Sequence, residues 1–367
     1  MFLISVIITG CSPDAGTGRR PRGEIYQMLL AAAPENRSEW VIEREGLDAK
    51  NMYDNYEFTI ADAKNWLLQT GGDINFVLQM RHPTDFAYDN IELSAEMQYN
   101  IILHFLEAQK ALAQDGFHAL TPRFFIGSLE TEPKTNKEHT GAAIYKLVSQ
   151  KLIAQGYKTD MIAGMYIGED SIAPNEVLVN ASLREACTYM HRLGKKVIWI
   201  PYSIEGNVEK YKETLLADVD NDGRVAYDIV LMQYCTFYWL TGPAEQAAQE
   251  TAERIHRLLH IKRDLEPWLA EHHITLGIHM EFDMGLSIGR TTQHLNMPAE
   301  TKRDIFKTCL ELILPEAEKG MALGLYSGGP NEQGYNDITV NRNTHNIGYY
   351  IPYAEHVSHY PPMEGWQ

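Results

Sequence analysis

The sequence predicts an α/β fold, a single (β/α)8 TIM-like barrel. Short apolar runs alternate with amphipathic stretches from about residue 70 onward, the order expected of a parallel sheet with crossover helices. The glycine fingerprint of dinucleotide-binding sheets follows none of these runs, which favours a closed barrel over an open sheet. The chain has 367 residues, and barrels typically take ~250 residues and can exceed ~400.

Seven apolar runs predict seven of the strands. Each is short and apolar without alternation, as expected of a parallel strand that is buried on both faces. They are INFVLQM (74–80), PRFFIGSL (122–129), MIAGMYIG (161–168), KVIWIPYS (196–203), YDIVLMQYCTF (227–237), ITLGIHMEF (274–282) and MALGLYS (321–327). We expect the eighth strand within 38–60, with SEWVIER (38–44) as its candidate.

The stretches between these runs predict helices, because their apolar residues recur at intervals of three and four. The expected helices cover 93–115, 138–155, 176–193, 207–217, 244–272 and 298–319. Gly156, Gly194 and Gly320 closely follow three of them, where a helix commonly ends in a left-handed residue.

Composition and charge narrow the classes of function. Hydrophobic residues make up 44% and charged residues 22% of the chain, as in ordinary globular proteins. The formal net charge is −17, which disfavours nucleic-acid binding, since that binding depends on Lys and Arg neutralising phosphates. Beyond the N-terminal run, no stretch approaches the roughly 20 apolar residues of a membrane-spanning helix.

The N-terminus predicts a lipid anchor. The apolar run MFLISVIITGC ends in Ile-Thr-Gly-Cys, which resembles the end of a bacterial lipoprotein signal with Cys11 as the lipidated residue. Residues 12–22 (SPDAGTGRRPR) have the polar composition of a tether. We therefore expect a signal remnant and tether over 1–22 and one barrel domain over 23–367, anchored by lipid at the bacterial cell envelope. The alternative is an N-terminal strand with a buried cysteine.

Two glutamates are the candidate catalytic residues. Active sites of such barrels form at the C-terminal ends of the strands, where Glu169 follows the run 161–168 and Glu281 is the second-to-last residue of the run 274–282. Glycoside cleavage uses a pair of carboxyl groups, one to protonate the leaving oxygen and one to attack or to activate water. Acidic residues after strands also cap helices, which is the alternative for Asp170.

Five segments resemble a known family. In order they are GMYIGED (164–170), KKVIWIPYS (195–203), YDIVLMQYCTF (227–237), HMEFD (279–283) and ALGLYSGG (322–329). They resemble motifs of the domain-of-unknown-function 4855 family, namely G-F-Y-W-x-E, W-I-P-Y, F-D-x-x-x-Q-P-N-Y, E-x-E-F-D and a Tyr-rich last strand. The resemblance covers about residues 160–330 and implies a glycosidase-like barrel.

The resemblance also implies roles for individual residues. Glu169 matches the glutamate after the fourth strand and would be the general acid/base, and Glu281 would be the nucleophile of a retaining mechanism. Tyr234 would hydrogen-bond Glu281 and help to keep it ionised. The expected contacts to an oligo- or polysaccharide come from Tyr166, Asp170, Tyr202, Gln233, Tyr234, His279, Asp283 and Tyr326.

The sequence departs from the family pattern beside both glutamates. His279 replaces the first glutamate of E-x-E-F-D, and Ile167 replaces the tryptophan of G-F-Y-W. Gly168 precedes Glu169, where related clan A glycoside hydrolases carry asparagine. These changes leave both glutamates in place but alter their neighbours.

The sequence offers two patterns that resemble metal sites. Asp218, Asp220, Asp222 and Gly223 follow the first half of a calcium loop, but Ile229 holds the position that needs a bidentate glutamate. We expect an Asp-rich turn there, with calcium as the alternative, and otherwise no cofactor. A pair of histidines, His256 and His260, has helical spacing that suits a metal but also suits a helix surface, which we favour.

Two further functions remain open. A non-catalytic carbohydrate-binding lipoprotein is possible on the same barrel. A metal-dependent hydrolase would instead use Asp170, His279 and Asp283. Loss of activity on chelation would indicate the metal-dependent hydrolase. Glycan binding without cleavage would indicate the binding protein.

Overall fold

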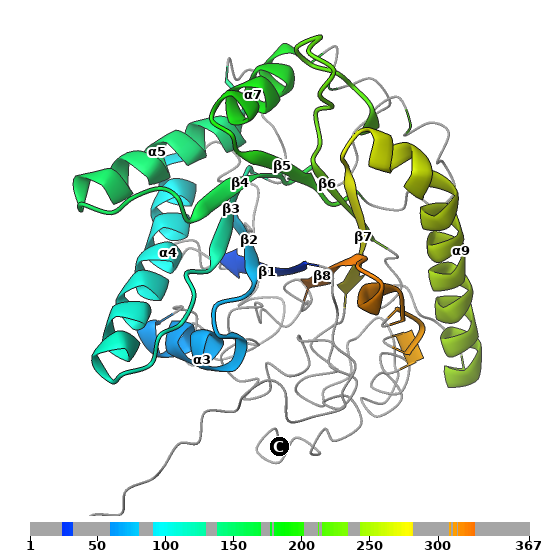
Figure 1. Ribbon diagram of the computed structural model, residues 1–367, viewed down its shortest axis with the longest axis horizontal. Coiled ribbons are helices and arrows are strands. Elements are labelled where there is room, and N and C mark those ends of the chain that lie inside the picture. Colours follow the sequence, from blue (N-terminus) through cyan, green and yellow to red (C-terminus); the bar gives the residue numbers. More distant parts are fainter. Residues whose placement is uncertain are drawn as a thin grey trace, which may run out of the picture.

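Eight parallel strands close into a barrel in the order β1 to β8 (Figure 1). The computed structural model describes residues 24–31, 59–80, 91–129, 138–169, 177, 180–201, 212, 215–233, 243–281, 308–309, 311–313 and 315–326. Helices lie outside the strands, so the prediction of a (β/α)8 barrel is confirmed.

Seven of the eight strands, β2 to β8, lie within the apolar runs that predicted them. They are β1 (Ile25–Ala31), β2 (Asn75–Met80), β3 (Arg123–Gly127), β4 (Ile162–Ile167), β5 (Lys196–Trp199), β6 (Ile229–Gln233), β7 (Thr275–Glu281) and β8 (Ala322–Tyr326). The predicted position of the eighth strand is wrong. The barrel is closed by β1, which pairs with both β2 and β8, whereas 38–44 lies outside the described residues.

The helices follow their amphipathic patterns closely. Their bounds are α3 (Ile60–Thr70), α4 (Ile91–Gln114), α5 (Thr140–Ala154), α7 (Ala181–Arg192) and α9 (Ala244–Glu271). The expected helices 207–217 and 298–319 are described only in part. The sequence prediction missed α3, although Thr59 and Asp62 form a reciprocal capping box at its start and Gly71 ends it in a left-handed conformation.

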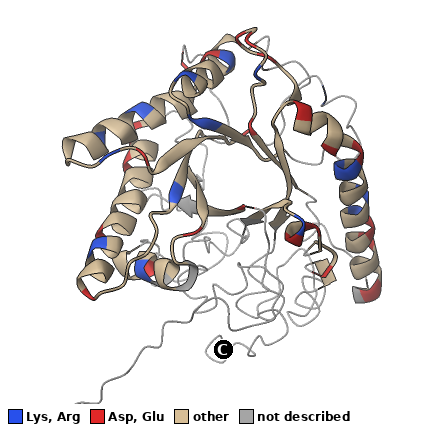
Figure 2. Cartoon of the chain, viewed as in Figure 1, with Lys and Arg blue, Asp and Glu red and all other residues tan. Residues whose placement is uncertain are grey.

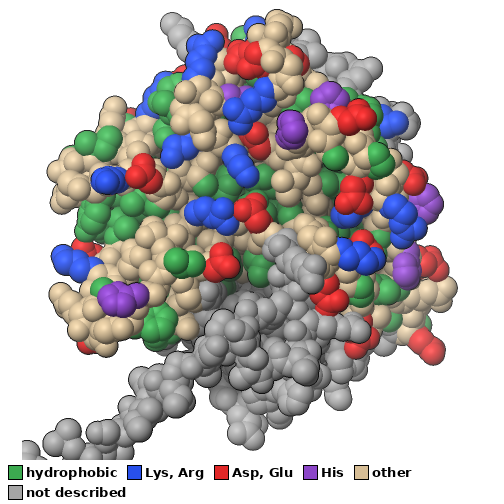
Figure 3. Space-filling model, viewed as in Figure 1, with side chains coloured by type: hydrophobic (Ala, Val, Ile, Leu, Met, Phe, Trp, Pro, Cys, Tyr) green, Lys and Arg blue, Asp and Glu red, His purple; other side chains and the backbone are tan. Residues whose placement is uncertain are grey.

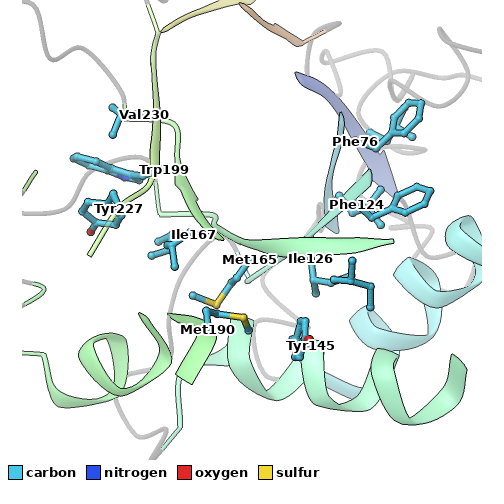
Figure 4. Packing of buried hydrophobic residues seen from close by; sticks show 14 of the residues in the cluster. Phe76, Phe124, Ile126, Tyr145, Met165, Ile167, Met190, Trp199, Tyr227 and Val230 are labelled. Carbon is cyan, nitrogen blue, oxygen red and sulfur yellow. The ribbon is translucent and has the colours of Figure 1, made fainter. Parts of the chain in front are cut away.

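Strand alternation divides the core into two layers. Side chains that point into the barrel, such as Tyr26, Phe125 and Leu231, form one buried cluster. Side chains that point outward pack against the helices, as Figure 4 shows for Met165 of β4 beside Met190 of α7. Full burial of such a side chain contributes roughly 1.5–3 kcal/mol, so these layers hold the strands that position the site.

The N-terminal end of the barrel is held by charged groups. Arg123 Nη1 lies 3.0 Å from Glu24 Oε1, and the Tyr26 hydroxyl donates a hydrogen bond to the same carboxylate. Burial raises the pKa of Glu24, but the hydrogen bond from Tyr26 and the attraction of Arg123 outweigh it and leave that pKa below its usual value. These charged and polar groups therefore pair with one another at the N-terminal end. We expect the active site at the opposite rim, where the strands end.

Within the described residues, the charged side chains lie mainly on the helices, and the strands carry few of them (Figure 2). Acidic and basic residues are interspersed over the face seen in Figure 3. Among the residues that the structure describes, no helix is both long enough and apolar enough to cross a membrane.

Candidate active site

The predicted site residues come from strands that end at the same rim of the barrel. Glu169 stands two residues beyond the end of β4, and Glu281 is the last residue of β7. Gln233 ends β6 and Tyr326 ends β8. Because all eight strands are parallel, their C-terminal ends lie at one end of the barrel, as the sequence analysis assumed.

Glu169 is half enclosed at this rim. Its side chain is 20% exposed, and its Oε2 lies 3.8 Å from Nε2 of His139, which is fully buried. His139 stands directly before α5, so the first turn of that helix comes up against the end of β4. The carboxylate therefore has one side against protein and retains some access to solvent.

The backbone around Glu169 is fixed on two sides. Gly168 N donates to Ser128 Oγ at 2.8 Å, which ties the end of β4 to the residue after β3. On the other side, Trp199 Nε1 of β5 donates to the backbone oxygen of Glu169 at 3.0 Å. The indole is fully buried and stacks on Tyr227, with ring centroids 5.1 Å apart. These contacts limit the positions from which Glu169 can act.

A buried glutamine supports the same corner from α4. The Gln98 amide donates to Gly127 O and accepts from Gly127 N, each at 2.9 Å, and so satisfies both backbone groups at the end of β3. Leu129 N donates to Thr140 Oγ1 at 3.1 Å, which ties the chain after β3 to the first turn of α5. The ends of β3 and β4 and the starts of α4 and α5 thus form one hydrogen-bonded corner.

His279 lies inside the barrel just below the rim. It is 1% exposed, and a Cβ at Gly324 would lie 2.4 Å from its Cδ2, so the ring needs a glycine on the neighbouring strand. Burial lowers its pKa to about 3, so the ring is neutral at physiological pH. Gln233 is its register partner on β6 and is also buried.

Glu281 is described by its backbone alone. It pairs in register with Tyr326 of β8, two residues beyond the His279–Gly324 pair. The side chains of Glu281 and Tyr326 lie outside the described part, as do four predicted contact residues in full. These are Asp170, Tyr202, Tyr234 and Asp283.

The structure corrects the expectation for Tyr166. We expected this residue to contact the oligo- or polysaccharide. It is 1% exposed and belongs to the cluster inside the barrel, with its ring among residues such as Phe125 and Ile198. Alternation along β4 turns Tyr166 inward, so it acts as a core residue.

The Asp-rich turn holds its carboxylates by internal contacts. Asp218 accepts from the backbone N–H groups of Asp222 and Gly223, and Asp220 accepts from Thr188 Oγ1 at 2.7 Å. No group of three or more His, Cys, Asp or Glu side chains in the described ranges is arranged to hold a metal ion. Both histidines of the helical pair, His256 and His260, are exposed on α9.

A cavity of about 500 Å³ lies elsewhere, between the outer sides of α5 and α7. Its lining carries both signs of charge, including Glu138, Lys146, Arg184 and Asp220. It lies in the helical layer and reaches Glu138, the residue next to His139, but Glu169 is not part of its lining.

Sequence reasoning missed the residues that support Glu169. Gln98 and Ser128 look like ordinary polar residues in the sequence, and their partners are known only once β3, β4 and α4 are packed together. His139 gave no clear signal, because histidine is not among the usual N-cap residues and the position fell inside the predicted helix 138–155. Its proximity to Glu169 has no signature in the sequence.

Comparisons with known proteins add little to this geometry. No family model matches the chain, and no curated protein matches it. Solved structures that resemble it include an intracellular xylanase from Thermoanaerobacterium saccharolyticum, with 11% identity, a TM-score of 0.35 and coverage of 84% of this chain and 86% of that one. A chitinase from Ipomoea carnea gives 12% identity, a TM-score of 0.36 and coverage of 87% and 98%.

A tryptophan synthase from M. tuberculosis matches equally well, with 10% identity, a TM-score of 0.35 and coverage of 90% of this chain and 94% of that one. Glycoside hydrolases are thus among the structural neighbours, but scores at this level carry no argument about function. The assignment of the barrel rests on the strand pairing itself.

Proposed function

We propose that the protein is a glycoside hydrolase that uses Glu169 as general acid/base and Glu281 as nucleophile. One observation carries the proposal: both glutamates stand at the C-terminal ends of strands, β4 and β7, in one closed parallel barrel. That rim is where barrel enzymes place their catalytic groups. The motif resemblance assigns the same two residues to the same roles.

The chemistry follows from two carboxyl groups on either side of a glycosidic bond. Glu169 gives its proton to the leaving oxygen while Glu281 attacks the anomeric carbon, and the bond to the leaving group breaks with its electron pair. Glu169 then takes a proton from water, and the resulting hydroxide cleaves the glycosyl ester on Glu281. This sequence retains the anomeric configuration and requires the carboxyl groups to stand about 5–5.5 Å apart.

The substrate contacts are proposed for the same rim. Asp170, Tyr202, Tyr234, Asp283 and Tyr326 follow or end strands there and offer hydroxyl and carboxylate partners for sugar hydroxyls. Two further proposed contacts, Gln233 and His279, are buried below the rim. They would reach a sugar only at the deepest position of the site.

We propose anchoring by a lipid on Cys11, which lies outside the described residues. The protein would then sit at the bacterial cell envelope, at the outer membrane or cell surface, with residues 12–22 as the tether. Replacement Cys11→Ser should abolish labelling by radioactive palmitate and move the protein from the membrane fraction to the soluble fraction. Unchanged membrane association in the variant would contradict the anchor.

A glycan digestion screen tests the enzymatic proposal. The wild type should release reducing ends from at least one polysaccharide in a broad panel, whereas Glu169→Gln and Glu281→Gln should lower kcat on that substrate by at least about 100-fold, the lower range for loss of a general acid. Glu271→Gln is the matched control, because Glu271 is exposed at the end of α9, before β7 begins, and should retain full activity.

Other outcomes of the screen identify the alternatives. Retained glycan binding with no cleavage by the wild type indicates a carbohydrate-binding lipoprotein. Activity that disappears with a chelator and returns with a divalent metal indicates a hydrolase that uses Asp170, His279 and Asp283.

A further inference from the structure

His139 is a buried imidazole that faces the proposed acid/base. It is the N-cap residue of α5 and is fully buried, and its Nε2 lies 3.8 Å from Glu169 Oε2. It comes from the helix after β3, whereas Glu169 follows β4, so two neighbouring βα units supply the two groups. The corner that holds them is the same one that Gln98 and Ser128 stabilise.

The cap determines which nitrogen of His139 carries the proton. Gly141 N donates a hydrogen bond to His139 Nδ1 at 3.2 Å, so Nδ1 must present a lone pair. In a neutral imidazole the single proton is then on Nε2. The helix cap thus fixes the tautomer whose N–H is on Nε2, the nitrogen that lies 3.8 Å from Glu169 Oε2, a separation longer than a hydrogen bond.

Close packing fixes the position of the ring. A Cβ at Gly141 would lie 2.6 Å from Met165 Sδ and 3.3 Å from His139 Nδ1, so a larger residue there would force the Met165 side chain to shift. Thr140 Oγ1 accepts from Leu129 N in the same turn. The imidazole is thus held by the first turn of α5, and the backbone that carries Glu169 is held through Gly168 N and the Glu169 backbone oxygen.

We propose that His139 is a positioning residue for Glu169, a role that rests on the proposed function. Its Nε2–H orients Oε2, which leaves Oε1 to carry the proton toward the leaving group. After that proton moves to the glycosidic oxygen and the C–O bond breaks, the new carboxylate is stabilised by the same N–H. In the second step Glu169 takes a proton from water, and the contact returns to its initial state.

The leaving group provides a readout that a purely structural role would not affect. Cleavage of an alkyl or sugar leaving group needs the proton from Glu169, whereas a 2,4-dinitrophenolate leaves without one. His139→Asn keeps an oxygen that can cap α5, since asparagine is a favoured N-cap residue, but removes the Nε2–H group. We expect kcat/KM to fall roughly 10- to 100-fold for the unactivated glycoside, as part of a general-acid contribution, and to change less than about threefold for the dinitrophenyl glycoside.

A second buried histidine serves as the matched control. His191 Nε2 lies 3.2 Å from Asp228 Oδ2. Asp228 stands directly before the start of β6, so this contact is at the N-terminal end of the barrel, opposite the rim that carries Glu169. His191→Asn removes a similar imidazole–carboxylate contact and should affect both substrates equally. Equal losses on both substrates in His139→Asn, or no loss on either, would overturn the positioning role.

Nitrogen NMR separates this inference from the proposed function. In protein labelled with ¹⁵N-histidine, the His139 ring should show the Nε2-protonated tautomer at neutral pH, and Glu169→Gln should shift its Nε2 resonance. His139→Asn identifies the signal. An inactive wild type would overturn the proposed hydrolase while these spectra still decide the contact. A proton on Nδ1, or an unmoved Nε2 resonance in Glu169→Gln, would overturn the contact itself.

Discussion

At the scale of single residues, burial decides the charge of His279. The side chain is enclosed by the barrel and faces a glycine on β8, so water cannot solvate an imidazolium there. Its pKa falls to about 3 in the folded protein, whereas a histidine in an unfolded chain titrates near 6.5. Between these two values the unfolded chain binds a proton that the folded protein does not bind.

This difference predicts how stability depends on pH. The contribution of His279 is fully present above about pH 6.5 and is lost as the pH falls from there toward 3, because protons then favour the unfolded state. Between pH 8 and pH 5, the wild type should lose about 2 kcal/mol of unfolding free energy more than His279→Gln. Urea unfolding of both proteins at the two pH values measures this, and equal losses would contradict the burial of a neutral imidazole.

The sequence placed Glu169 and Glu281 at strand ends because that position depends only on local apolar runs. It gave no indication that the Tyr166 ring is enclosed in the core, and it missed His139 altogether. The contact of His139 with Glu169 depends on how α5 packs against β4 through Gly141 and Met165. Such packing is a property of the assembled barrel, so neither segment reveals it alone.

At the scale of elements, the pairing of β5 with β6, which we call the β5–β6 joint, depends on one aspartate. Only Ile198–Ile229 and Trp199–Val230 pair in register there. Asp228 extends the joint, because its Oδ2 accepts from Val197 N at 2.7 Å. Burial raises the pKa of Asp228, but hydrogen bonds from His191, Arg224 and Val197 outweigh it and lower that pKa below its ordinary value.

Replacement Asp228→Asn should therefore weaken this joint. We expect a loss of about 2 kcal/mol in unfolding free energy at pH 7, since charge-assisted hydrogen bonds to a partly buried carboxylate are lost. A lowered carboxyl pKa stabilises the fold above the unfolded value near 3.9, and this contribution disappears as the pH falls further. The deficit of the variant should thus shrink in acid.

Urea unfolding at pH 7 and pH 3 tests this prediction. Asp115→Asn changes an exposed aspartate after α4 and should stay within about 0.5 kcal/mol of the wild type. A deficit for Asp228→Asn that is the same at both pH values would show that the carboxylate charge does not stabilise the joint.

The elements themselves were predicted unevenly. Long helices such as α4 and α9 were found almost to their ends, because many turns repeat the same apolar pattern. The shorter α3 was missed, although Thr59 and Asp62 give it a capping box, and β1 was placed too late in the chain. A strand contains only a few apolar residues, so its sequence pattern does not distinguish the run 25–31 from the nearby run 38–44.

At the scale of the whole molecule, closure of the barrel is a long-range event. β1 and β8 pair through Ile25–Leu323, Tyr26–Gly324 and Gln27–Leu325, so the two ends of the barrel sequence meet. The alternation of strands and helices predicted the barrel, but it contains no information about which run closes it. That choice is made by the register between segments far apart in the chain.

The same closure brings the candidate catalytic residues to one rim, and the distance between their carboxyl groups decides whether the proposed hydrolase stands. A crystal structure of the wild type should place the carboxyl groups of Glu169 and Glu281 about 5–5.5 Å apart over one cleft if cleavage is retaining. A separation of roughly 6.5–9.5 Å would keep the hydrolase but make it inverting. Carboxyl groups well over ~10 Å apart, or a Glu281 side chain that points away from the cleft, would contradict the proposed glycoside hydrolase.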